Sequence, residues 1–473
     1  MENLEICYMS VIEMTEAIKS KRLSPVEIMD AILSRIERLN SKVNAYCTLV
    51  AESARKQARE AETMVMRGEK LGPLHGIPVS IKDLTFTRGI RTTFGSKIYE
   101  NFVPQQDAIV AERLKAGGAI IIGKTNTPEF GFKGVTDNGL FGATRNPWNL
   151  ERTSGGSSGG AAAAVASGMG PLAQGSDGGG SIRIPSSFCG VFGFKPSFGR
   201  VPQYPGFLAW GTHSCTGPIT RTVKDAALAM EVIAGRDDRD RFSLPETDLR
   251  YLPLLGDELK GLKIAWSEDL GYTVVDPRVL AITKAAVKTF DTLGATVEAA
   301  QPAVKNPETS FSTVVGVGLA TLLKDKIEEW REQMDPLLVR FIERIKNKLA
   351  TEYGEAYLEL MEYWNGMRSF FEKYDLLLTP TVAVPPFELG NFGVREIAGV
   401  KVSPLTWISF AYAFNITGQP AATVPCGWTD DGLPIGLQIV ARRFDDATVL
   451  KAAAAFEQAS PWTEKLPPLG EEA

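Results

Sequence analysis

The residues with the clearest chemical potential stand in two clusters of glycine and serine, GGSSGG at 155–160 and GSDGGGS at 175–181. A short alanine-rich stretch at 161–167 separates the clusters and is predicted to be helical. Linkers lie between polar, weakly patterned segments, and this composition differs from theirs. Because glycine permits positive φ and close approach of the backbone, the serines would sit on tight turns. Such turns present nucleophilic hydroxyls and oxyanion-binding N–H groups, although a purely structural cluster of turns stays open.

The second cluster fits none of three common glycine-rich motifs. A phosphate-binding loop needs a lysine after its last glycine, and neither cluster has one. A dinucleotide fingerprint needs a strand, Gly-x-Gly-x-x-Gly and a helix in that order, which the second cluster lacks. The Gly-x-Ser-x-Gly elbow of many hydrolases is absent around Ser181.

Histidine is scarce, because the chain has only His75 and His213. A Ser-His-Asp hydrolase needs a histidine to relay the proton. His75 precedes a turn into a strand, which favours a structural role, and His213 stands in a loop without an obvious partner. If the chain is a hydrolase, its base is therefore expected to be another residue.

Lys82 is the candidate for that base. It directly follows a short buried strand predicted at 77–81 and precedes Asp83. On the local sequence alone, the simpler interpretation is a lysine that leaves the strand toward solvent and pairs with Asp83. The functional interpretation is a buried amine that desolvation keeps neutral, so that it can accept a proton.

The composition is that of a globular protein without a sign of nucleic-acid or membrane binding. The chain has 473 residues, of which 44% are hydrophobic and 23% charged, and a net charge of −5. This charge gives no electrostatic case for nucleic acid or anionic membranes. No stretch approaches the roughly 20 apolar residues of a membrane helix, and the N-terminus does not read as a signal peptide, so we expect a cytoplasmic protein. The scattered cysteines indicate neither a disulfide framework nor a metal site (Cys7, Cys47, Cys189, Cys215 and Cys426).

Strands and helices alternate along the chain and predict an α/β fold. Ser24, Pro25 and Glu27 have the residue types of a capped helix start, and an apolar face follows as far as Leu39. The other expected elements are helix 51–67, strand 77–81, helix 107–116, strands 119–122 and 262–266, helix 281–293, a charged helical block at 309–374 broken near Asp335-Pro336, strands 376–378, 422–424 and 436–439, and a closing helix at 445–458. In this arrangement the glycine clusters fall in loops at strand ends.

With both clusters and Lys82 in view, the sequence resembles the amidase signature family over nearly its whole length. The family motif is similar to GGSSGG, then GS-D-x-GGS-I-R-x-P, then C-G-x-x-G-x-K-P. The chain has these segments at 155–160, 175–185 and 189–196. Further matching segments lie at 75–83, 123–127, 144–147, 415–420 and 433–438. A motif this long, with several companions in order, is highly specific.

The resemblance implies a Ser–cis-Ser–Lys triad, in which Ser181 is the nucleophile, Ser157 the bridging serine and Lys82 the base. The Gly156–Ser157 peptide would be cis. The implied oxyanion hole consists of the backbone N–H groups of Gly178, Gly179, Gly180 and Ser181, and no metal or cofactor is required. Other matching residues are expected to support the site, Ser158 and Ser176 by hydrogen bonds and Asp177 with Arg183 as a structural pair.

The resemblance also implies the fold, which is an α/β amidase-signature fold with a large mixed central sheet, helices on both faces and a helical insertion. We expect a single domain over residues 1–473. Its parts would be N-terminal helices (1–70), a signature core (71–230), a helical insertion or cap (300–375), and returning strands with a closing helix (376–473).

The activity implied is hydrolysis of the C–N bond of small, aryl or alkyl amides, and carbamates or amide oligomers suit the same chemistry. The expected partner is a small-molecule substrate, and a homodimer stays open. The alternative is the glutaminase subunit of the tRNA-dependent amidotransferase, which feeds ammonia to a partner. Gly178 and the segment 184–187 look unlike that subunit. A catalytically inactive binding module is disfavoured, because all three triad positions are intact.

The substrate pocket is the least defined part of the site. Family members often carry threonine or a larger residue where this chain has Gly178, so the acyl side of the pocket would be wider or the loop looser. Aromatic residues in loops near the triad motifs are expected to form an apolar substrate wall, with ordinary loop packing as the alternative (Phe130, Phe132, Tyr204, Phe207 and Trp210).

Overall fold

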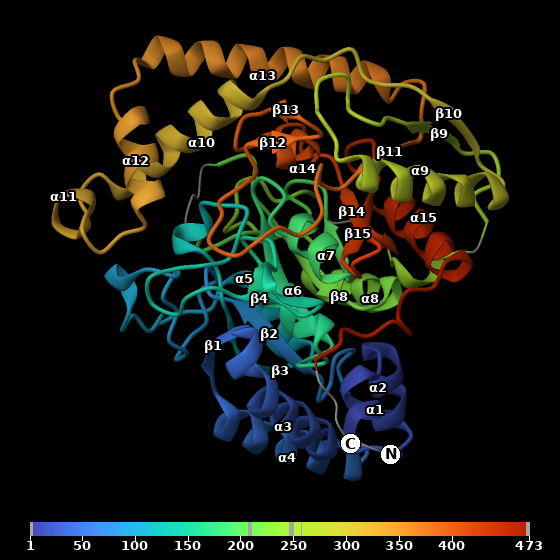
Figure 1. The fold of residues 1–473 in the computed structure, drawn as a ribbon. Coiled ribbons are helices and arrows are strands. Elements are labelled where there is room, and N and C mark those ends of the chain that lie inside the picture. Colours follow the sequence, from blue (N-terminus) through green and yellow to red (C-terminus); the bar gives the residue numbers. More distant parts are fainter. Residues whose placement is uncertain (1–2, 207–210, 246–249, 257, 470–473) are drawn as a thin grey trace.

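The centre of the protein is a mixed sheet of eleven strands (Figure 1). The computed structural model describes residues 3–206, 211–245, 250–256 and 258–469. The strands follow the order β1 (Tyr46–Leu49), β3 (Ile120–Thr125), β2 (Pro78–Lys82), β6 (Leu172–Asp177), β8 (Cys215–Thr220), β7 (Phe192–Lys195), β14 (Ala421–Trp428), β15 (Pro434–Ala441), β11 (Leu376–Pro380), β9 (Lys263–Trp266) and β10 (Thr296–Ala299). The predicted α/β fold with a large mixed sheet is therefore confirmed.

Parallel and antiparallel pairs alternate in blocks across this sheet. β2 lies between β3 and β6 and is parallel to both. The middle of the sheet, from β6 through β15 to β11, is antiparallel, and the far edge, β11 with β9 and β10, is parallel again. Strands buried on both faces are nearly continuous apolar runs, and β15, with every residue buried, follows this rule.

The N-terminal segment forms helices α1 (Asn3–Tyr8), α2 (Val11–Lys19), α3 (Pro25–Val43) and α4 (Ala51–Met66). The capped start predicted for α3 is confirmed, because Ser24 Oγ accepts hydrogen bonds from the N–H groups of Val26 and Glu27 at 3.0 and 3.2 Å. The Glu27 carboxylate in turn accepts from the Ser24 N–H at 2.8 Å. The sequence did not predict the edge strand β1, which lies between α3 and α4.

Helices cover both faces of the sheet (Figure 1). They are α5 (Ile109–Ala116), α6 (Gly159–Ala166), α7 (Arg183–Cys189), α8 (Val223–Ile233), α9 (Pro277–Thr292), α14 (Ser409–Ile416) and α15 (Asp446–Ala459). Short two-stranded pairs lie outside the main sheet, β4 (Arg145–Asn146) with β5 (Asn149–Thr153) and β12 (Glu396–Ile397) with β13 (Val400–Lys401). Among the described residues, no helix has both the length and the apolar character needed to cross a bilayer.

Four further helices, here called the cap helices, lie together above the sheet (Figure 1). They are α10 (Glu308–Leu323), α11 (Ile327–Trp330), α12 (Pro336–Ile345) and α13 (Ala350–Phe370). The predicted break near Asp335 is the start of α12, where the Asp335 carboxylate accepts from the Leu337 N–H at 2.8 Å and Pro336 occupies the first turn. Apolar side chains of α10 and α12 share a core cluster with Phe130, so these helices close over the sheet region that carries the glycine clusters. The division of the chain into one domain with four parts stays a prediction.

Candidate active site

Lys82 is the last residue of β2, and its side chain is fully buried. The interpretation that it leaves the strand toward solvent and pairs with Asp83 is therefore wrong. β3 and β6 flank β2, so its end is enclosed by the sheet. Lys82 Nζ donates to Ser157 Oγ at 2.7 Å and to Ser176 Oγ at 3.0 Å. Burial lowers the pKa of Lys82 to about 7, against the opposing charge of Asp177, so much of this amine is neutral at neutral pH.

The first glycine cluster brings Ser157 to Lys82 by a close approach of the backbone. Gly155 has φ +74°, and the Gly156–Ser157 peptide is cis. A Cβ on Gly156 would lie 2.6–2.9 Å from backbone atoms of Val135, so no other residue fits there. Ser157 is 2% exposed, and its hydroxyl lines a large cavity.

Ser158 and Ser176 join the two clusters. The Ser158 N–H donates to the carbonyl oxygen of Ser181 at 3.1 Å. Ser158 Oγ donates to the Ser176 carbonyl at 3.2 Å, and Ser176 Oγ accepts from Lys82 Nζ. The structure thus brings the expected supporting serines into contact with residues of the implied triad.

The second cluster is the turn between β6 and α7, and it carries Ser181 beside the cavity. Ser181, Gly178 and Gly179 line the cavity, whereas Gly180 does not. The Gly180 N–H donates to Asp177 Oδ1 at 2.8 Å. The expectation that this N–H belongs to the oxyanion hole is therefore not what the structure shows, since its hydrogen is already committed. Within the described ranges, the N–H groups of Gly178, Gly179 and Ser181 have no protein acceptor.

Asp177 and Arg183 form a fully buried ion pair that holds this turn. Arg183 Nε and Nη2 donate to the two carboxylate oxygens of Asp177 at 3.0 and 2.9 Å. Arg183 also donates to Asn415 of α14 and Gln438 of β15 at 2.7 and 2.6 Å, and Asn415 Nδ2 donates back to the Asp177 carbonyl at 2.7 Å. Burial alone would raise the pKa of Asp177, but the Arg183 guanidinium holds it well below its usual range.

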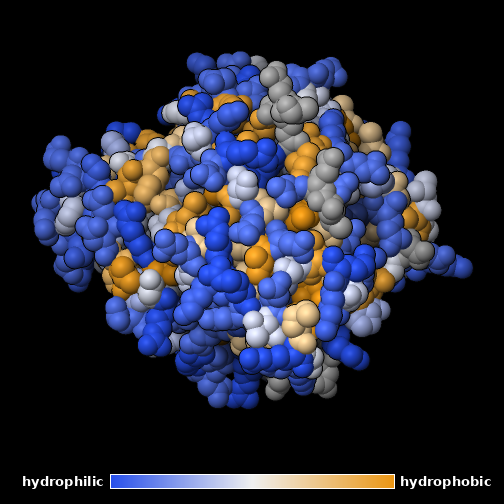
Figure 2. All heavy atoms as spheres, turned by 90° about the horizontal axis from the view of Figure 1, so that it is seen from below, coloured by the Kyte–Doolittle hydropathy of each residue, from blue (hydrophilic) through white to orange (hydrophobic). Residues whose placement is uncertain are grey.

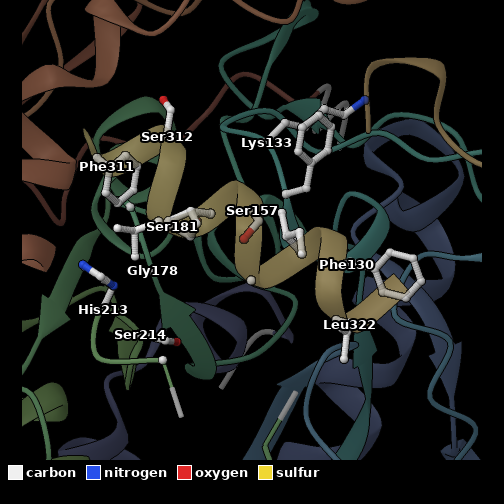
Figure 3. A pocket seen from close by; sticks show the side chains of 18 of the residues that line it. Phe130, Lys133, Ser157, Gly178, Ser181, His213, Ser214, Phe311, Ser312 and Leu322 are labelled. Atoms are coloured by element: carbon white, nitrogen blue, oxygen red, sulfur yellow. The ribbon is translucent and has the colours of Figure 1, made fainter. Parts of the chain in front are cut away.

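The cavity has a volume of about 1540 Å³ and lies between the glycine clusters and the cap helices (Figure 3). Of the aromatic residues expected in its wall, Phe130, Phe132 and Tyr204 line it. Phe207 and Trp210 lie outside the described residues. Phe311 and Leu322 of α10 also line the cavity. The sequence analysis missed them, because an apolar residue of a cap helix has the same local pattern whether it faces a core or a cavity.

The two histidines have different surroundings. His75 Nε2 lies 3.0 Å from the Ala61 carbonyl oxygen in a buried contact, which agrees with a structural role. His213 lines the cavity, and its ring meets the Phe311 ring edge-on with centroids 6.0 Å apart. Burial lowers the pKa of His213 to about 4, so this imidazole is uncharged at neutral pH.

The buried amine of Lys82 is hydrogen-bonded to Ser157, and Ser181 lines the same cavity from a turn whose N–H groups at Gly178, Gly179 and Ser181 have no acceptor among the described residues. These are the parts of an acyl-transfer site that does not use histidine. Residues 27–450 match the family model for amidases, described as "Amidase", and the chain belongs to this family.

Known proteins of this family are similar to the chain over almost its full length. It is 41% identical to an acylamidase of Rhodococcus erythropolis, over 97% of both chains. It is 40% identical to one of the subunits of the glutamyl-tRNA(Gln) amidotransferase of Moorella thermoacetica, over 99% of this chain and 100% of that one. The crystal structure of a bacterial aryl acylamidase of the amidase signature family superposes with a TM-score of 0.92 at 34% identity, over 97% of both chains. The protein is therefore an enzyme that hydrolyses amide C–N bonds, and its substrate is an amide.

Proposed function

We propose that the protein is an acylamidase that works without partner subunits and hydrolyses N-acyl amides through an acyl-enzyme on Ser181. The observation that carries this proposal is the 2.7 Å contact between Lys82 Nζ and Ser157 Oγ at the wall of a cavity that Ser181 also lines. When Lys82 is neutral, the same contact can pass a proton from Ser157 to the amine.

In the first half of the reaction, Lys82 takes a proton from Ser157 while Ser157 takes one from Ser181. Ser181 Oγ then forms a bond to the carbonyl carbon of the substrate. The N–H groups of Gly178, Gly179 and Ser181, which have no acceptor among the described residues, receive the developing oxyanion. Removing one such donor typically costs about 3–4 kcal/mol.

In the second half, the C–N bond breaks and the leaving amine takes a proton from Ser157, which recovers it from Lys82. Water then attacks the ester on Ser181 by the same relay and releases the carboxylic acid. The buried pair of Asp177 and Arg183 does not touch the substrate in this scheme and keeps the turn in place.

A hydrolysis screen of the purified chain tests this proposal. The substrates are anilides, alkyl amides, carbamates, esters and glutamine, each with and without the other subunits of an amidotransferase. Turnover of anilides by the chain alone supports the proposal. Turnover of glutamine only, and only with a partner, would instead assign the chain to an amidotransferase complex. The cytoplasmic location and the homodimer stay predictions.

Phe132 is expected to contribute to the binding of aryl amides. Its ring stacks on Phe392 with centroids 6.1 Å apart and lies 6.0 Å from the Phe341 ring, so cavity residues from three segments meet there. Burying a ring of this size is worth about 1.5–3 kcal/mol, or about 10- to 150-fold in kcat/KM. Phe132→Ala should therefore reduce kcat/KM by about this factor for acetanilide and only slightly for acetamide. An equal fractional loss on both substrates, together with a lower melting temperature, would leave loop packing as the role of Phe132.

A further inference from the structure

The three glycines before Ser181 have different surroundings. Gly180 has φ +113°, and a Cβ there would lie 2.4 Å from the Ala411 Cβ. A Cβ on Gly179 would lie 3.1 Å from the Phe311 ring. Gly178 has no left-handed φ, and among the described residues the only atom within 4 Å of an added Cβ is the Ser214 Cβ at 3.9 Å. Of these three positions, only Gly178 could therefore carry a side chain without strain, and the absence of one leaves space in the cavity.

The space beside Gly178 belongs to one end of the cavity, which we call the Gly178 lobe and define by Gly178, His213, Ser214 and Phe311 (Figure 3). Hydrogen bonds from side chains of other segments fix the backbone of two of its lining residues, His213 and Ser214. Asn415 Nδ2 donates to the His213 carbonyl at 3.0 Å, and Gln203 Nε2 donates to the Ser214 carbonyl at 2.6 Å.

A ring contact supports the remaining wall of this lobe. The Phe311 ring stacks on Tyr412 with centroids 4.9 Å apart. Because closely packed side chains move little, one extra methyl group on Gly178 would reduce the size of the substrate group that the lobe can hold.

The cavity continues on the other side of the serine pair into a second lobe, the Phe130 lobe, where Figure 3 shows Phe130 and Leu322. Phe132, two residues after Phe130, also lines the cavity and is counted in this lobe. This lobe adjoins Ser157, because a Cβ on Gly131, between the two phenylalanines, would lie 3.3 Å from Ser157 Oγ. The Gly178 lobe adjoins the turn that carries Ser181 instead. The two serines thus lie between the two lobes of one cavity.

The direction of the proton relay decides which half of an amide lies in which lobe, an argument that rests on the proposed function. The leaving nitrogen must take its proton from Ser157, so the amine half lies on the side of Ser157, in the Phe130 lobe. The acyl half stays bonded to Ser181 and therefore lies in the Gly178 lobe. We infer that Gly178 sets the size of the acyl group that the enzyme accepts, because it leaves open the part of the Gly178 lobe that a side chain would fill.

The surroundings of this lobe also indicate the chemistry of the acyl group. The His213 imidazole is uncharged at neutral pH, and Phe311 presents an aromatic face beside it. The lobe therefore suits an uncharged, bulky acyl group, such as a branched or aromatic one.

The test compares two substrate series in the wild type, Gly178→Ala and Gly178→Val. One series holds the amine constant as aniline and enlarges the acyl group from acetyl through isobutyryl to benzoyl. The other holds acetyl constant and enlarges the amine from ammonia through aniline to naphthylamine. We expect Gly178→Val to lower the benzoyl-to-acetyl ratio of kcat/KM by about 10-fold or more, with a smaller effect for alanine. The ratios in the amine series should stay as in the wild type.

Leu322→Phe is the matched control, because this change narrows the other lobe. Leu322 is 37% exposed on α10, so a larger ring there need not disturb the core. This variant should lower kcat/KM for the naphthylamine amide relative to acetanilide and leave the ratios of kcat/KM within the acyl series as in the wild type.

Two outcomes would overturn the inference. A loss in Gly178→Val that is equal for all acyl groups would mean a disturbed oxyanion turn, and a loss that follows the size of the amine would mean that the lobes are reversed. Absence of anilide turnover in the wild type would be a different result, since it refutes the proposed function and the inference with it. Melting temperatures of the variants show that each is folded.

Discussion

Replacing Ser181 by alanine should abolish amide hydrolysis and leave the protein folded. The expected loss in kcat is at least about a thousandfold, because water cannot replace the nucleophile in the same geometry. Ser181 lines the cavity and ends the turn in which, among the described residues, the N–H groups of Gly178, Gly179 and Ser181 have no protein acceptor. Steady-state rates on an anilide measure the loss, and an unchanged melting temperature shows that the turn still forms.

A covalent label identifies the nucleophile independently of the mutation. A serine-directed fluorophosphonate should modify Ser181, and mass spectrometry of the digested protein locates the adduct. The label should be absent from Ser181→Ala. An adduct on Ser157 or Ser158 would contradict the assigned roles, since both serines lie in the neighbouring cluster.

The second large effect is expected at Lys82. Because the reaction needs the neutral amine, kcat/KM of the wild type should rise with pH through about 7, the pKa to which burial lowers Lys82. The protonated form dominates below this pH and cannot accept a proton, which fixes the sign. Lys82→Ala should reduce kcat/KM by about a hundred- to ten-thousandfold and remove the rise.

Lys124 offers a matched control for this experiment. It is also a fully buried lysine near the end of a neighbouring strand, β3, and burial lowers its pKa to about 8. Its Nζ donates to Thr87 Oγ1 and Thr92 Oγ1 rather than to a serine of the clusters. Lys124→Met should cost stability, but its remaining activity should keep the pH profile of the wild type. Near-normal activity of Lys82→Arg would refute the role of base, because a guanidinium does not give up its proton.

Much of the fold follows from local sequence signals. Ser24, Pro25 and Glu27 specify the start of α3 through contacts within four residues, and the structure has these contacts. The core strands β11, β14 and β15 were predicted from apolar runs alone. Edge strand β1 was missed because it is short and only partly buried, so its sequence carries little apolar pattern.

The candidate site depends on contacts between distant segments, which local patterns do not contain. The burial of Lys82 comes from β3 and β6 on either side of β2. The interpretation of a lysine that leaves the strand toward solvent is wrong for this reason. The use of the Gly180 N–H by Asp177 depends on how the turn folds back on itself. Phe311 and Leu322 reach the cavity only because α10 crosses above it (Figure 3).

The outer surface of the protein does not identify a binding site as the buried residues do. Polar and apolar side chains alternate over the face seen in Figure 2, and apolar atoms are common on the surface of any folded protein. Exposed apolar residues of the cap, such as Leu349 and Leu358, do not by themselves identify what would cover them.

The hydrogen bonds from Arg183 to Asn415 and Gln438 have a consequence for how the enzyme is made. The ribosome releases the turn at 177–183 well before α14 and β15, which supply these two partners. Until they dock, the guanidinium lacks two of its acceptors, and the turn lacks the contacts that hold it in the complete fold. We therefore expect the nucleophile to be set in place among the last events of synthesis, so that a nascent chain has no hydrolytic activity toward the amides around it.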